Sequence, residues 1–170
     1  FLSPVDFLLP EMEGHAELNH RIRPYSAGHD LLGFRNDSVP ETSPILAIGD
    51  SMTYGVAASH RDAWPRQLER LLEKPVYNMA LGGYGPVHYQ HLLTEFGLAM
   101  QPELVIVGLY FGNDLMDAYN LVYSNESWAH LRREDSEDGV AAEGLIDLPP
   151  EGKLFGGLRN WLARHSVIYR

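Results

Sequence analysis

Between residues 45 and 110 the hydrophobic positions follow two patterns that alternate along the chain. Short continuous apolar runs at residues 45–48, 76–77 and 104–110 predict strands that are covered on both faces. Two sets of apolar residues at helical spacing lie between these runs and predict amphipathic helices: Trp64, Leu68, Leu71 and Leu72 in the first, and Tyr89, Leu92, Leu93 and Phe96 in the second. The order strand, helix, strand, helix, strand predicts an α/β fold with a parallel sheet and right-handed crossovers.

The regions on either side of this core lack a persistent hydrophobic period. Residues 1–44 are interrupted by five prolines, which predicts an irregular N-terminal segment that packs on the domain or links it to something upstream. The domain itself is assigned to residues 45–170. The stretch from Ser124 to Gly152 is polar, acidic and rich in Gly and Pro, so we expect an inserted surface loop at about residues 118–153. A further helix is predicted over residues 154–168.

Composition removes several classes of function. The formal net charge is −10, which argues against a nucleic acid or an anionic membrane surface as partner, because phosphate contacts need clustered Lys and Arg. No apolar run approaches the roughly 20 residues that span a bilayer. The chain has no cysteine, which excludes disulfides, thiolate catalysis and cysteine-based zinc sites. We expect no metal and no organic cofactor.

Each predicted strand ends in a loop of glycine and polar residues. These loops are residues 49–55 (GDSMTYG), 78–85 (NMALGGYG) and 111–114 (FGND). Because the carboxyl ends of parallel strands meet at one edge of a sheet, we expect the three loops to converge on one crevice. The chemistry that fits is acyl transfer, in which a serine just past a strand attacks a carbonyl and preorganised donors stabilise the oxyanion.

Ser51 is the candidate nucleophile, and three groups can donate to the oxyanion. They are the backbone N–H of Ser51, the backbone N–H of Gly83 and the side-chain amide of Asn113. Glycine at position 83 lets the backbone approach closely, and the asparagine amide donates without carrying a charge. Asp50 and Asp114 are expected to support their loops through capping or hydrogen bonds to loop amides.

These residues resemble the sequence blocks of the SGNH/GDSL hydrolases, a family that includes bacterial esterases and lipase-like enzymes. Residues 45–55, with Gly-Asp-Ser intact, resemble the first block. Gly83, five residues after Asn78, resembles the second, and residues 112–114 (GND) resemble the third. The resemblance extends over about residues 45–117. Residues 30–36 (DLLGFRN) resemble a segment that precedes the first block in some bacterial members.

The resemblance carries several implications. It implies a flavodoxin-like three-layer α/β/α sandwich, Ser51 as nucleophile, and Ser51, Gly83 and Asn113 as the oxyanion hole. It also implies export from a bacterial cell, to the periplasm or the outside.

One part of the family's pattern is not found in this sequence. The last block, Asp-x-x-His, supplies the general base and its orienting carboxylate, yet none of the eight histidines here has Asp three positions before it. The chain starts at Phe1 and stops at Arg170, before two further strand–helix units that the implied fold would require. We therefore expect a fragment whose catalytic Asp and His belong to a missing C-terminal part, without which Ser51 has no obvious activator.

Three functions fit the three loops. The leading hypothesis is a hydrolase that cleaves a small, acetyl-like ester of a small molecule or carbohydrate through an acyl-enzyme on Ser51. A carbohydrate O-acetyltransferase would use the same residues and differ in its acceptor. A catalytically inactive binding module is the third, motivated by the missing histidine. A nucleotide-binding domain is disfavoured, because residues 82–85 do not fit G-x-G-x-x-G.

His88 and His91 lie one turn apart on the second predicted helix. A metal pair is conceivable at this spacing, but no third ligand has a suitable position. The preferred interpretation is an exposed helical face.

Overall fold

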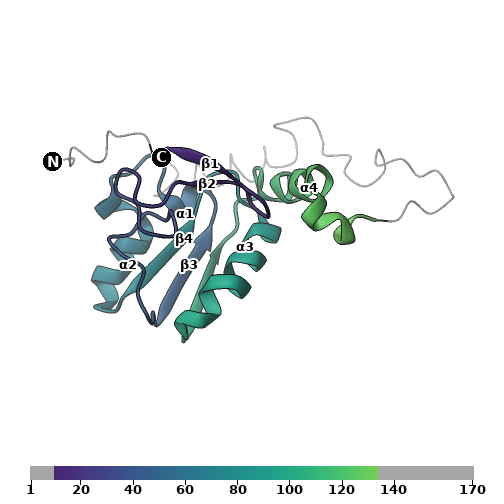
Figure 1. Ribbon diagram of the computed structural model, residues 1–170. Helices are drawn as coiled ribbons and strands as arrows, with labels where there is room; N and C mark the ends of the chain where they lie inside the picture. Colours follow the sequence, from purple (N-terminus) through teal and green to yellow (C-terminus); the bar gives the residue numbers. More distant parts are fainter. Residues whose placement is uncertain (1–9, 134–170) are drawn as a thin grey trace, which may run out of the picture. The chain divides into compact units, whose positions relative to one another are not determined.

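The computed structural model describes residues 10–133, which form a mixed α/β fold with a three-stranded parallel sheet (Figure 1). The strands are β3 (Ile45–Gly49), β4 (Val76–Ala80) and β5 (Leu104–Gly108), and their order in the sheet is β4-β3-β5. In the register, Gly49 is level with Ala80 on one side and with Gly108 on the other. The three predicted strands are therefore confirmed, and their carboxyl ends lie at one edge.

Helices cover both faces of this sheet (Figure 1). On one face, Leu46 and Ile48 pack in a core cluster with Leu92 of α3 (Pro86–Leu92), which continues through η3 (Leu93–Gly97) and η4 (Leu98–Met100). On the other face, Ile45 and Ala47 pack with side chains of α2 (Trp64–Leu72). Since successive side chains of a strand point to opposite faces, a fully apolar strand fits two helical layers.

Two apolar features predicted as core are more exposed than expected. Of the four apolar residues predicted to line α2, Trp64 and Leu68 pack on the sheet, while the side chains of Leu71 and Leu72 are exposed. Strand β3 is wholly buried, whereas Leu104 and Val107 of β5 are exposed, because β5 lies at an edge of the sheet that residues 10–133 form. The prediction of a strand covered on both faces is therefore wrong for β5 within this part of the chain.

The N-terminal segment contains a β-hairpin that the sequence does not predict. Strands β1 (Met12–His15) and β2 (Asn19–Ile22) pair antiparallel, and in Figure 1 they lie at the end of the sheet where α1 begins. The Tyr84 hydroxyl donates to the carbonyl of His20 at 2.9 Å and so ties the hairpin to the loop after β4. The prediction of an irregular segment is wrong here, because the four-residue strands MEGH and NHRI show no apolar alternation.

Asp30 organises the segment between the hairpin and β3. Its carboxylate is 1% exposed and accepts four hydrogen bonds at 2.7–3.1 Å, from the backbone N–H groups of Leu32 and Phe34, the Asn36 amide and the Tyr77 hydroxyl. Asn36 in turn bonds the backbone N–H and carbonyl of Asn78 in β4, both at 3.0 Å. The side chain of Asn36 therefore attaches this segment to the backbone of β4.

Arg35 connects the same segment to the loop that follows Ser51. Its guanidinium donates to the carbonyls of Gly55 at 2.9 Å and Ala58 at 3.1 Å, and it lies 5.1 Å from the centre of the Tyr54 ring. His29 adds a hydrogen bond to the Tyr54 hydroxyl at 2.9 Å. The segment therefore contacts both strand β4 and the first of the three loops, residues 49–55.

The chain after the third loop is helical where a loop was expected. Helix α4 (Asp114–Ser124) buries Leu121 and Val122 and is followed by η5 (Glu126–Leu131). The predicted surface loop at about residues 118–153 is therefore wrong as far as residue 131, because α4 buries few apolar residues and so gives a weak helical period. The remainder of that loop and the helix at 154–168 lie outside the described residues. No helix within residues 10–133 has the length and apolar character to cross a bilayer.

Candidate active site

Ser51 is the first residue of α1 (Ser51–Tyr54), a short helix that begins directly after β3. Asp50 caps this helix, because one oxygen of its buried carboxylate accepts from the N–H of Met52 at 2.8 Å. The Ser51 hydroxyl donates to the other oxygen at 3.2 Å. Ser51 is partly exposed. Because it follows β3 directly, it lies at the carboxyl edge of the sheet, on a turn that Asp50 stabilises.

Two glycines at strand ends make room for this turn. A Cβ at Gly49 or at Gly108 would lie 2.2 Å from Oγ1 of Thr53, which is 1% exposed. The side-chain amide of Asn78 donates to the carbonyl of Thr53 at 3.2 Å. Thr53 is therefore seated between the ends of β3 and β5, and the glycine of Gly-Asp-Ser is required for space.

The second loop lies beside Ser51. Gly82 and Gly83 form the middle of a turn in which the N–H of Tyr84 donates to the carbonyl of Leu81 at 3.2 Å. A Cβ at Gly82 would lie 3.5 Å from Cβ of Ser51. Gly83 has φ +81°, as the third residue of a type II turn requires, so glycine is needed there for its backbone conformation. A Cβ at Gly83 would also meet the ring of His20 at 3.4 Å.

Asp114 connects the third loop to the second. Its Oδ2 accepts from the N–H of Tyr110 at 2.7 Å and lies 2.7 Å from the hydroxyl of Tyr89. That hydroxyl is also 2.9 Å from the carbonyl of Tyr84. A Cβ at Gly85 would lie 2.3 Å from the carbonyl oxygen of Asp114, so the two loops are in backbone contact.

The environment of Asp114 raises the pKa of its carboxyl. Burial raises the pKa of this carboxyl, and the negative charges of Asp50 and Asp117 add to the effect, although the hydrogen bonds from Tyr110 and Tyr89 oppose it. The Tyr89 hydroxyl has one proton for two acceptors. That proton is therefore shared between the Asp114 carboxyl and the carbonyl of Tyr84.

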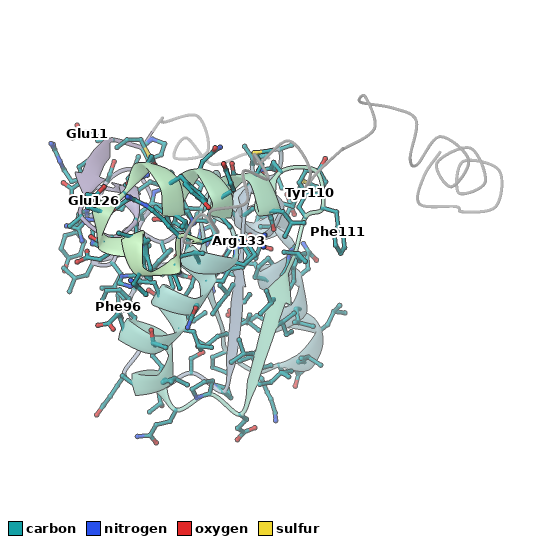
Figure 2. All side chains as sticks on the ribbon, turned by 90° about the vertical axis from the view of Figure 1, so that its right-hand side faces the viewer. Glu11, Phe96, Tyr110, Phe111, Glu126 and Arg133 are labelled. Carbon is teal, nitrogen blue, oxygen red and sulfur yellow. The ribbon has the colours of Figure 1, made fainter. Side chains whose placement is uncertain are left out.

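Asn113 directly precedes α4 and is the third candidate oxyanion donor. Its side-chain amide donates to the carboxylate of Asp117, one turn along the helix, rather than to Ser51. The structure therefore places Ser51 beside the Gly82–Gly83 turn and that loop against Asp114, while the Asn113 amide is held on the first turn of α4. Two aromatic residues beside it, Tyr110 and Phe111, are exposed at the end of β5 (Figure 2).

His20 is a residue of this region that the sequence analysis does not single out. Its Nε2 lies 3.1 Å from the carbonyl oxygen of Gly82, and its ring lies 5.4 Å from the ring of Tyr84. Because His20 belongs to β2, far from the three loops in the chain, no local sequence pattern could indicate this contact.

His88 is buried, at 3% exposure, which corrects the expectation of an exposed helical face. Its Nδ1 accepts from the N–H of Gly85 at 3.0 Å, and its ring stacks on Tyr84 at 4.5 Å. Burial lowers the pKa of His88 to about 4, and the charge of His20 adds to this effect. Among the residues that the structure describes, no group of three or more His, Asp or Glu side chains could hold a metal ion.

The lowered pKa of His88 predicts a loss of stability in mild acid. Between pH 6.5 and about 4 the unfolded chain binds a proton that the native state excludes, so the free energy of unfolding should fall as pH falls, by roughly 3 kcal/mol in total. In His88→Asn the amide oxygen can replace Nδ1 as acceptor without titrating, and this part of the pH dependence should disappear. Urea unfolding at pH 7 and pH 4.5 measures the difference. The exposed His130 gives the control, since His130→Asn should keep the wild-type pH dependence; an equal dependence in His88→Asn would contradict the prediction.

Comparison of the chain with protein-family models, with curated proteins and with solved structures finds no match in any of the three.

Proposed function

We propose that this chain carries the nucleophile and part of the oxyanion site of a serine hydrolase of the SGNH/GDSL type, with a flavodoxin-like three-layer arrangement. The observation that supports it most is the meeting of loops at the carboxyl edge of the sheet. There a partly exposed serine on a capped turn lies against the two-glycine turn of the second loop. The three strands end level, so these groups come from separate loops held by one rigid sheet.

The chemistry assigned to this site is cleavage of a small acyl ester. The Ser51 oxygen attacks the acyl carbon, its proton passes to a general base, and the alcohol departs with a proton, leaving an acyl group on Ser51. Water then attacks the acyl-enzyme, which releases the carboxylic acid and restores the hydroxyl. The oxyanion of each tetrahedral intermediate accepts from the N–H groups of Ser51 and Gly83 and from the Asn113 amide.

The hydrogen bond of Asn113 indicates which of its two amide N–H groups is assigned to the oxyanion. In the structure its amide donates to Asp117, so one N–H of the amide is engaged within α4. An amide nitrogen carries two donor hydrogens. Asp117 therefore orients the carboxamide, and the other N–H is the one assigned to the oxyanion.

Labelling with a fluorophosphonate probe tests this proposal in the full-length protein. An activated serine displaces the fluoride and forms a stable phosphonate ester, so the adduct should map to the peptide that contains Ser51. Ser127, an exposed serine of η5, provides the internal control and should stay unlabelled. Absence of an adduct on Ser51 would contradict the proposal and favour an inactive binding module.

A carbohydrate O-acetyltransferase remains the related alternative, because it would form the same acyl-enzyme. The product separates the two activities: transfer of the acetyl group to water identifies a hydrolase, and transfer to a glycan hydroxyl identifies a transferase.

A further inference from the structure

His20 holds one particular peptide group of the site, the one that joins Gly82 and Gly83. Its Nε2 lies 3.1 Å from the Gly82 carbonyl oxygen. A carbonyl can only accept, so Nε2 must carry the proton of this hydrogen bond. The bond therefore fixes both the imidazole tautomer and the direction in which the Gly82 carbonyl points.

The direction of that carbonyl determines the direction of the neighbouring N–H. In a planar trans peptide the C=O of one residue and the N–H of the next point to opposite sides. With the Gly82 carbonyl turned towards His20, the N–H of Gly83 faces away from the hairpin. Gly82 itself lies against Ser51, since a Cβ there would be 3.5 Å from the Ser51 Cβ.

This peptide is one that can turn over. It is the central peptide of the Leu81–Tyr84 turn, where rotation by about 180° interconverts types I and II, and only type II needs positive φ at the third residue. Glycine accepts either sign of φ, and two consecutive glycines offer little steric resistance to rotation. Gly83 is found at φ +81°, the form in which the Gly82 carbonyl meets His20.

The hairpin that carries His20 is itself anchored to this turn. The Tyr84 hydroxyl donates to the backbone carbonyl of His20 at 2.9 Å, and the two rings lie 5.4 Å apart. The backbone that carries the imidazole is therefore bonded to the same loop, which limits the freedom of the ring to follow a rotating peptide.

We propose that His20 is a positioning residue that locks the Gly82–Gly83 peptide with the Gly83 N–H aimed for the oxyanion. The effect of His20 on catalysis rests on the proposed function. His20 acts through the peptide and not as an acid or base, so a side chain that keeps a donor at the place of Nε2 should replace it. Glutamine meets that condition, because its amide nitrogen lies near the position of Nε2.

The first test reads the peptide itself and requires no activity. In the full-length wild-type protein, ring ¹⁵N spectra of neutral His20 should show a protonated Nε2 and an unprotonated Nδ1. The amide resonance of Gly83 should shift in His20→Ala and return towards the wild-type position in His20→Gln. An unprotonated Nε2, or a Gly83 resonance that is unchanged in His20→Ala, would overturn the inference.

The second test measures ester hydrolysis in the same variants. His20→Ala should lower kcat by roughly 10- to 100-fold, up to the loss typical of one missing oxyanion donor, with KM little changed. His20→Gln should recover most of kcat. His15→Ala is the matched control, because it removes another histidine of the same hairpin, paired with Glu17 and not with the turn.

The two proposals fail in different ways. Equal losses of kcat in His20→Gln and His20→Ala would reject the positioning role while Ser51→Ala still showed the serine mechanism. If turnover survived Ser51→Ala, both the proposed function and the role of His20 in catalysis would be rejected. The Gly83 amide resonance would still decide whether His20 orients the Gly82–Gly83 peptide.

Discussion

Ser51→Ala should lower turnover of a generic acetyl ester by roughly 10⁴-fold or more in the full-length protein, the scale seen when a serine hydrolase loses its nucleophile. The substitution removes only the hydroxyl, which donates to Asp50 at 3.2 Å. The cap of α1 does not depend on that hydroxyl, because Asp50 bonds the N–H of Met52 independently. The variant should therefore fold as the wild type does, and the loss should be one of chemistry.

Steady-state hydrolysis by the wild type and by Ser51→Ala measures this effect, once equal melting temperatures have shown that the variant is folded. Ser127→Ala, at the exposed serine of η5, is the control and should retain full activity. Activity of Ser51→Ala within about tenfold of the wild type would exclude an acyl-enzyme on Ser51, because the residual catalysis left without a nucleophile is far smaller than that.

Asp30→Ala should destabilise the fold by about 4 kcal/mol, the largest effect on stability that we expect from a single polar residue of the chain. The carboxylate is 1% exposed and accepts four hydrogen bonds. Its removal leaves the buried Tyr77 hydroxyl, the buried N–H of Phe34 and the partly buried N–H of Leu32 without this acceptor. It also removes one partner of Asn36, which bonds the backbone of β4. The melting temperature should fall by roughly 10 °C or more.

Urea unfolding of Asp30→Ala and Asp37→Ala gives a matched comparison. Asp37 belongs to the same segment, but its side chain is 81% exposed and pairs with Arg66 at the surface, so its loss should cost at most about 1 kcal/mol. Asp30→Asn should be intermediate, because it keeps one oxygen acceptor in place. Equal destabilisation by Asp30→Ala and Asp37→Ala would show that the buried network is not what holds the segment.

The sheet and its first loop could be predicted from the sequence because their signals are local. A buried parallel strand such as β3 is apolar at every position, and Gly-Asp-Ser follows it directly. The place of Ser51 at the start of a turn after that strand required no knowledge of distant residues. The hairpin β1–β2 gave no such signal, because its four-residue strands have no apolar alternation and its burial of Leu18 and Ile22 depends on residues distant in the chain.

By itself the sequence determined the order of the strands and helices between residues 45 and 108, the parallel sheet and the three loops at its carboxyl edge, because periodicity and chain connectivity are properties of neighbouring residues. Only the tertiary structure decided that His20 meets the Gly82 carbonyl and that His88 is buried. The orientation of a peptide and the pKa of a side chain depend on which groups fold against it. For His20 and Gly82 those groups are 62 positions apart in the chain.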